Sequence, residues 1–236
     1  MYWLILIPVI LFIIYFSYMF YASGNIRSGV YLKTLYKGDT TEKKVCITFD
    51  DGPSELSEKV LGALRKHNAK ATFFLIGNKV AQNPETVRKI VADGHLVGAH
   101  TWSHTGKFTV CKYENAKIDI ERGSEEITRV CGKQVKLFRP PFGVTNPNIA
   151  KAVKETGHIV IGWNVRMFDT IPGISIAFKM RRLISKVRPG SVIQLHDKCR
   201  NADIIVDEML TKLANNGYKI VSLEEMFNIE AYETVK

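Results

Sequence analysis

The sequence predicts an α/β fold, a distorted (β/α) barrel of about seven parallel strands, preceded by an N-terminal transmembrane helix. Short apolar segments alternate with amphipathic segments along most of the chain, and this order favours parallel strands joined by helices. Most of the apolar segments are continuous, as expected for strands that are covered on both faces. The chain has 236 residues, of which 46% are hydrophobic, enough for one sizeable core and a membrane segment.

The first 22 residues contain no charged side chain and predict an uncleaved membrane anchor, because crossing the hydrocarbon core takes about 20 apolar residues. A cleaved signal peptide is the alternative, since Ala22, Ser23 and Gly24 are small. However, no Lys or Arg precedes the apolar run, which is longer than the usual h-region of roughly 7–15 residues. Residues 23–43 are then a polar linker, and residues 44–236 form one domain.

Seven short segments are predicted as strands from their apolar and β-branched content: residues 45–49, 71–76, 96–99, 135–138, 158–163, 191–195 and 219–221. Helices are predicted between them at residues 55–67, 84–93, 113–130, 148–156, 175–187 and 202–216. Pro84 suits a first helical turn, and Gly132, Gly157 and Gly217 each follow a predicted helix end.

The net charge of +10 indicates a basic surface that could be attracted to an anionic envelope polymer or lipid surface. No nucleic-acid-binding motif accompanies the charge, so nucleic acid is not an expected partner. The four cysteines form no CxxC pair, which argues against a zinc–thiolate site and leaves their pairing open.

Side chains that could bind a metal or transfer a proton follow the predicted strands. Asp50 and Asp51 end the first strand, and His100 and His104 follow the third. Three more residues come after later strands: Arg139, Asp169 and His196. Because the carboxyl ends of parallel strands gather on one face of a barrel, we expect these side chains to converge.

One carboxylate and two neutral imidazoles make a divalent-metal site with open positions for water and substrate. The spacing of His100 and His104 places both rings on one side if the segment makes a helical turn. Asp50 and Asp51 supply one more carboxylate than such a site needs. One aspartate can therefore hold a metal while its neighbour acts as a base.

Four ordered motifs in this chain resemble those of the polysaccharide deacetylases of the NodB-homology type, carbohydrate esterase family four. They are Thr48-Phe49-Asp50-Asp51-Gly52-Pro53, His100-Thr101-Trp102-Ser103-His104, Arg139-Pro140-Pro141-Phe142-Gly143 and Gln194-Leu195-His196-Asp197. The resemblance covers residues 44–227, which is the whole predicted globular part.

The resemblance implies that Asp51, His100 and His104 bind a divalent metal, commonly zinc, with cobalt, nickel and manganese as alternatives. It implies that Asp50 is the general base and that Arg139 holds its carboxylate in place. His196 would be the general acid, supported by Asp169. The fourth motif matches only in part, because Arg166 stands where the family commonly has an aspartate and Thr170 where it commonly has a tryptophan.

The predicted substrate-binding residues are Phe142, Trp102, Trp163 and Leu195. The backbone N–H of Phe142 is expected to stabilise an oxyanion. Two interpretations stay open for the aromatic rings of Phe142, Trp102 and Trp163. They could be core aromatics, or they could form a platform on which a sugar stacks.

The resemblance implies a membrane-anchored, metal-dependent hydrolase that cleaves linear amide C–N bonds, removing N-acetyl groups from peptidoglycan or another envelope saccharide. Two alternatives are an O-acetyl esterase on the same fold and a saccharide-binding pseudoenzyme. The expected partners are the saccharide and the membrane, with a monomeric catalytic domain. Arg27, Lys33 and Lys37 would keep that domain in the cytoplasm by the positive-inside rule, whereas wall or capsule polymers as substrates place it outside. An internal lipid-linked sugar is the substrate alternative.

Overall fold

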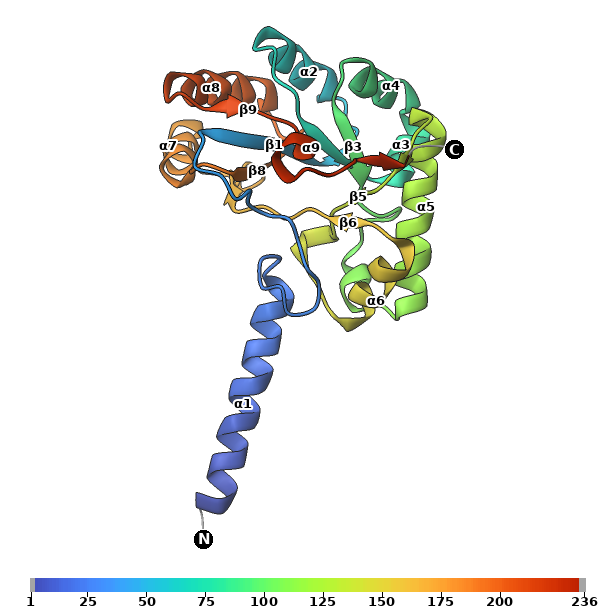
Figure 1. The fold of residues 1–236 in the computed structure, drawn as a ribbon, viewed down its shortest axis with the longest axis vertical. Coiled ribbons are helices and arrows are strands. Elements are labelled where there is room, and N and C mark those ends of the chain that lie inside the picture. The colour runs from blue at the N-terminus through green and yellow to red at the C-terminus, as the bar shows by residue number, and fades with distance from the viewer. Residues whose placement is uncertain (1–2, 234–236) are drawn as a thin grey trace.

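The computed structural model describes residues 3–233. A long helix, α1 (Trp3–Gly24), projects from an α/β domain as a single rod (Figure 1). Among the described residues, α1 is the one helix whose length and apolar composition would suffice to cross a membrane. Its side chains are mostly exposed. The predicted long apolar N-terminal helix is therefore confirmed.

The domain is built on one parallel sheet whose seven-stranded path runs in the order β6-β5-β3-β2-β1-β8-β7. These strands are β1 (Lys44–Gly52), β2 (Thr72–Leu75), β3 (Leu96–Ala99), β5 (Leu137–Phe138), β6 (Ile159–Val160), β7 (Val165–Arg166) and β8 (Ser191–His196). A further strand, β9 (Lys219–Ile220), pairs with β1. The sheet curls into a half-barrel, which confirms the predicted α/β class and parallel pairing.

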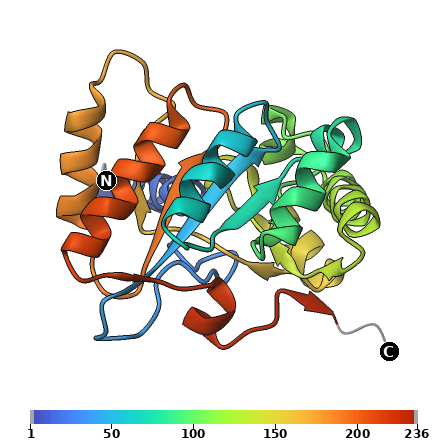
Figure 2. The ribbon, with the colours of Figure 1, turned by 90° about the horizontal axis from the view of Figure 1, so that it is seen from above.

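Helices cover the curled sheet. They are α2 (Ser57–Lys66), α3 (Gly77–Gln82), α4 (Pro84–Ala92), α5 (Tyr113–Cys131), α6 (Pro147–Thr156), α7 (Ile176–Lys186), α8 (Ala202–Asn215) and α9 (Leu223–Phe227). Figure 1 shows α2 and α8 on the side away from α1, and Figure 2 shows the strands running between the flanking helices. Two short 3-10 turns, η1 (Gly106–Val110) and η2 (Pro141–Gly143), lie in loops.

The central strands are buried along almost their whole length, and their aromatic side chains build the core. Phe49 of β1 and Phe73 of β2 stack with their ring centroids 4.9 Å apart. All but the first residue of β1 are buried, and all of β2 and β8. This two-sided burial is the physical reason for the continuous apolar segments in the sequence.

Some boundaries differ from the prediction. The segment predicted as one strand at residues 135–138 is divided between two sheets, because β4 (Gln134–Val135) pairs antiparallel with β10 (Tyr232–Glu233) while β5 pairs with β3 and β6. The prediction did not include β7, β10 or α3. All three are too short, at two to six residues, for an apolar period to stand out.

The segment between α1 and β1 is ordered along the sheet. The Leu35 N–H donates to the carbonyl of Val160, and the Gly162 N–H donates to the carbonyl of Leu35, each at 2.9 Å. Lys37 makes an antiparallel bridge to Ser191. Backbone hydrogen bonds therefore hold this polar segment, which follows α1, against the domain.

Candidate active site

Most of the predicted site residues converge on one pocket of about 250 Å³ at the carboxyl ends of the strands. Its lining includes Asp50, Asp51, His100, His104, Phe142, Trp163 and His196, together with Arg166, Thr170, Gln194 and Lys198. Arg139 and Asp169 lie directly behind this lining, where they contact Asp50 and His196. These side chains from distant segments therefore lie together at the strand ends.

A local irregularity at the end of β1 allows two adjacent carboxylates to share this pocket. Neighbouring residues in a regular strand point to opposite faces. Here the register between β1 and β2 shifts between Asp50 and Gly52, and Asp51 has a φ of 70°. The bulge turns the Asp51 side chain to the same side as that of Asp50.

Asp51, His100 and His104 form a compact group of potential metal ligands. The Oδ1 atom of Asp51 lies 3.5 Å from Nε2 of His100 and 3.2 Å from Nε2 of His104. One ligand atom from each of the three residues lies within 4.8 Å of the others. His104 has a φ of 46°, a strained backbone of the kind that often occurs at functional sites.

The protonation states of this group fit a divalent cation. His100 donates from Nδ1 to the carbonyl of Arg139 at 2.6 Å, so a neutral ring presents a bare Nε2 to Asp51. Burial lowers the pKa of His104 to about 4, which keeps that ring neutral at pH 7. Burial raises the pKa of Asp51, but the ammonium of Lys198, 2.7 Å from its Oδ2, helps to hold that pKa well below its usual range. An ionised carboxylate facing two imidazole nitrogens is a donor set that a divalent metal ion stabilises.

Asp50 is held on both oxygens. Oδ1 accepts a hydrogen bond from Arg139 and Oδ2 one from Gln194, each at 2.6 Å. Burial raises the pKa of this carboxyl, but the charges of Arg139 and His196 and the Gln194 hydrogen bond bring it below its usual value. Asp50 is therefore an oriented, ionised carboxylate beside the potential metal ligands.

His196 is oriented by Asp169, which accepts from its Nδ1 at 2.9 Å and from its backbone N–H at 2.6 Å. The other ring nitrogen, Nε2, lies 4.0 Å from Asp51 on the pocket side. Burial lowers the pKa of His196, but the hydrogen bond and charge of Asp169, with the charges of Asp50 and Asp51, raise it overall. A proton carried by this ring would face the pocket.

Sequence reasoning missed two side chains of the pocket. Lys198 reaches Asp51 Oδ2 at 2.7 Å, and Gln194 fixes Asp50. Gln194 belongs to the motif Gln194-Leu195-His196-Asp197 and lies two residues before His196. Because side chains two residues apart in a strand face the same side, the sequence could have indicated that Gln194 faces the pocket. Lys198 follows the strand in a turn, and nothing in the sequence shows where a turn residue points.

The predicted substrate-binding residues are placed differently from one another. Phe142 and Trp163 line the pocket, and the Phe142 ring is 57% exposed and 4.9 Å from the His104 ring. Trp102 lies in a separate surface hollow, where the guanidinium of Arg122 covers its ring at 3.7 Å. Leu195 is 1% exposed within the core. The structure thus brings two of the four to the pocket.

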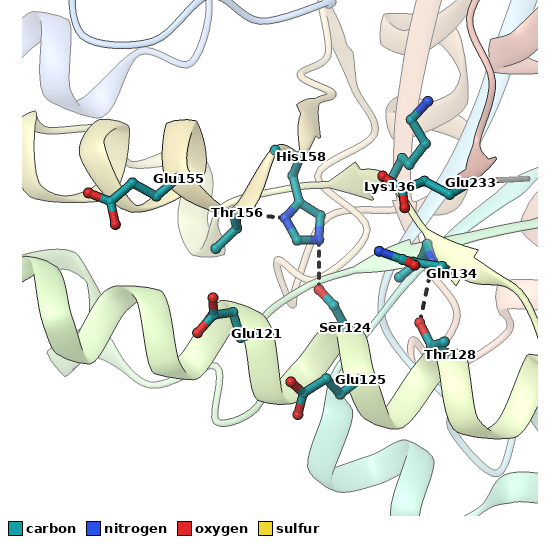
Figure 3. A pocket seen from close by; sticks show the side chains of 12 residues that line it. Glu121, Ser124, Glu125, Thr128, Gln134, Lys136, Glu155, Thr156, His158 and Glu233 are labelled. Carbon is teal, nitrogen blue, oxygen red and sulfur yellow. Dashed lines mark hydrogen bonds between the residues drawn. The ribbon is translucent and has the colours of Figure 1, made fainter. Parts of the chain in front are cut away.

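Another cavity, of about 430 Å³, lies between α5 and α6 and contains His158 and several glutamates (Figure 3). The His158 ring bridges Thr156 Oγ1 and Ser124 Oγ, each at 2.8 Å, and the Ser124 hydroxyl also donates to the carbonyl of Ile120 (2.9 Å). Because the serine proton is already used, the Ser124–His158 pair is a satisfied structural network. The chemistry of the molecule is therefore concentrated at the strand ends.

Comparisons with known proteins agree with this geometry. Residues 37–161 match the family model described as polysaccharide deacetylase. The chain is 33% identical over 199 residues to a peptidoglycan-N-acetylglucosamine deacetylase of Bacillus cereus, an alignment that covers 81% of this chain and 71% of that protein. It is 31% identical over 188 residues to the peptidoglycan-N-acetylglucosamine deacetylase PgdA of Listeria monocytogenes, but spans only 39% of that longer protein.

A solved structure extends the match to three dimensions. The Bc1960 peptidoglycan N-acetylglucosamine deacetylase superimposes with a TM-score of 0.79 at 30% identity, covering 84% of this chain and 94% of that one. With the motifs, the half-barrel and the pocket in agreement, the chain belongs to the polysaccharide deacetylase family.

Proposed function

We propose that this protein is a metal-dependent hydrolase that removes N-acetyl groups from an N-acetylated envelope saccharide. The observation that carries the proposal is the pocket in which Asp50, the Asp51–His100–His104 group and His196 face one another. Relatives named as peptidoglycan deacetylases support peptidoglycan as the first substrate to test.

Asp51, His100 and His104 would hold the cation, and zinc suits their mixed nitrogen and oxygen donors. When bound, such a cation supplies Lewis-acid polarisation of a carbonyl and lowers the pKa of water. The carbonyl of Arg139 accepts a hydrogen bond that orients the His100 ring. The ammonium of Lys198 contacts the second oxygen of Asp51.

Proton transfer would be divided between two side chains. Asp50, ionised and held by Arg139 and Gln194, would take the proton of the attacking water. His196, whose Nε2 faces the pocket, would give a proton to the departing nitrogen. An amine is a poor leaving group as an anion, so a positioned acid favours amide cleavage over ester cleavage. Asp169 acts through His196 as its positioning residue, and the backbone N–H of Phe142 would contact the oxyanion.

The exposed apolar helix α1 supports a membrane anchor, with the catalytic domain facing the wall polymers outside the cytoplasm. The activity is tested by acetate release from peptidoglycan fragments and chitin oligomers. Asp50→Asn should lower kcat by about 100-fold or more, because general base catalysis typically contributes factors of about 10²–10⁴. A variant that keeps wild-type acetate release would refute the role of Asp50.

Metal content tests the ligand set separately. His104→Ala should lose bound zinc after dialysis, whereas His67→Ala, which removes a histidine paired with Asp207 far from the pocket, should retain it. Equal zinc content in the two variants would contradict the assignment. Zinc retention without acetate release from either N- or O-acetylated sugars would instead favour a saccharide-binding pseudoenzyme.

A further inference from the structure

A second groove, of about 520 Å³, lies beside the catalytic pocket. The two cavities share three lining residues, Phe142, Trp163 and Arg166. Arg166 is one of the two positions that depart from the fourth motif, so the altered wall of the active site is also the wall of this groove. A ligand in the groove would therefore border the reacting centre.

The other end of the groove is formed by the last turn of α1. Tyr21, Gly24 and Asn25 line it. This turn is fixed to the domain, because the Ser23 hydroxyl donates to the carbonyl of Thr145 at 2.7 Å and the Thr145 N–H donates back to the carbonyl of Ser23 at 2.9 Å. If α1 spans the bilayer, the groove starts at the membrane surface and leads to the catalytic pocket.

Four cations line the groove, and we call them the groove cations: Arg27, Arg166, Arg182 and Lys186. The groove lining contains no Asp or Glu. Within residues 3–233, none of the four forms an ion pair with a carboxylate. The groove is thus a place where positive charge gathers without a partner from the chain.

Two of these guanidiniums are positioned by one aromatic ring. Arg182 lies 4.3 Å and Arg166 lies 5.4 Å from the ring centroid of Phe168. Arg182 also donates to the backbone carbonyl of Arg166 at 3.2 Å. Both guanidiniums therefore lie against the same ring in the groove, and a phosphate accepts bidentate hydrogen bonds from arginine.

We propose that the groove cations bind the phosphate or diphosphate that joins an N-acetylated sugar to a membrane lipid. The lipid chain would lie in the bilayer beside α1, the phosphate at the helix end, and the sugar in the catalytic pocket next to Trp163. This inference rests on the proposed deacetylase function and names its substrate class. General attraction of basic residues to anionic lipid is the rival explanation.

The test uses full-length protein in nonionic detergent, which removes anionic lipid. Three probes are compared by acetate release: N-acetylglucosamine linked to a prenyl chain through a diphosphate, the same sugar linked directly to an alkyl chain, and soluble N-acetylglucosamine 1-phosphate. We expect kcat/KM to be at least about tenfold higher for the diphosphate lipid than for the neutral glycolipid, a difference set mainly by KM. The soluble sugar phosphate should be a poorer substrate than the diphosphate lipid, since it has no lipid chain.

The double variant Arg182→Gln/Lys186→Gln should bring the ratio between the two glycolipids close to one. The matched control, Lys59→Gln/Lys219→Gln, removes two exposed cations from α2 and β9, away from α1, and should keep the wild-type ratio (Figure 1). Equal use of both glycolipids by the wild type, or an unchanged ratio in the double variant, would overturn the inference. If acetate is still released from chitin oligomers in that case, the proposed deacetylase function stands. Absence of acetate release from every substrate would overturn both.

Discussion

Arg139 is the residue on which the candidate site depends most directly. Its side chain is fully buried and donates to Asp50, to the Thr48 hydroxyl and to the carbonyls of Ile161 and Gly162 at 2.6 to 3.0 Å. The guanidinium therefore ties the ends of β1 and β6 together while it positions the proposed base. A buried charge of this kind is tolerated because nearly all its donors are satisfied.

Replacing Arg139 with methionine should destabilise the domain by about 3–5 kcal/mol, because Asp50 would remain as a buried charge without its partner. Urea unfolding measures this change. The matched variant Arg122→Met removes an exposed arginine that covers Trp102, and it should cost less than about 1 kcal/mol. Similar midpoints for the two variants would show that the buried pair does not stabilise the fold.

We expect Asp197 to make the stability of the fold depend on pH. Burial raises the pKa of this carboxyl to about 6, although the Ser57 hydroxyl donates to its Oδ2 at 2.5 Å. Its Oδ1 is buried and has no hydrogen-bond partner within the described chain. Because the folded state holds the proton more tightly than the unfolded state, this group should cost stability as pH rises from about 4 to 6, and the cost persists above that.

Asp197→Asn should therefore stabilise the protein relative to wild type at pH 7, by at most about 3 kcal/mol, and the difference should shrink towards pH 4. Thermal unfolding across this pH range measures it. Asp39→Asn, at an exposed position, should change stability by less than about 0.5 kcal/mol at every pH. A variant less stable than wild type at pH 7 would contradict the assignment.

At the scale of elements, α5 supports the loop that carries the histidines. A Cβ atom on Gly123 would lie 2.6 Å from the carbonyl carbon of Thr101 and 2.7 Å from its oxygen. Only glycine permits this close approach of the helix to the backbone between His100 and His104. The loop that carries the two histidines of the potential metal site is thus positioned by a helix that contributes no ligand to it.

Gly123→Ala should push α5 away from this loop, at a cost of about 1–3 kcal/mol, and it should also weaken zinc binding. Unfolding and zinc titration measure the two effects. Gly62→Ala, in α2, is the matched control: its Cβ would meet nothing within 4 Å, so it should stabilise the helix by about 0.5–1 kcal/mol. If Gly123→Ala binds zinc like the wild type, α5 does not position the loop.

At the scale of the whole molecule, hydrogen bonds between Ser23 and Thr145 connect the end of α1 to the domain. Ala22, near the end of α1, is fully buried, whereas most of the helix before it is exposed. The proposed path of the lipid-linked sugar depends on this connection, because the groove at the end of α1 shares lining residues with the candidate active-site pocket.

The full-length chain should remain with membranes after an alkaline carbonate wash and should keep residues 1–22, since α1 is long enough to span the bilayer. Membrane fractionation with N-terminal sequencing measures both. A chain that starts at Met19 keeps the contacts of Ala22 and Ser23 and should be found in the soluble fraction. A mature protein that starts near Ser23 or Gly24 would show that the segment is a cleaved signal peptide.

The sequence by itself determined the fold class and the elements that carry the site. Apolar segments and helix caps are local signals, so they predicted the parallel sheet and placed Asp50, His100, Arg139 and His196 at the strand ends. The family motifs then indicated a division of labour between the two aspartates, which stays a prediction.

Only the tertiary structure decided how these side chains meet. The turn of Asp51 depends on a bulge against β2, the contact of Lys198 with Asp51 joins residues far apart in the chain, and the groove forms where α1 meets β7. Local periodicity carries no information on such contacts, because they arise from the register and packing of distant segments. Trp102 and Leu195 belong to the family motifs but lie outside the pocket, because packing and not the motif decides where their side chains point.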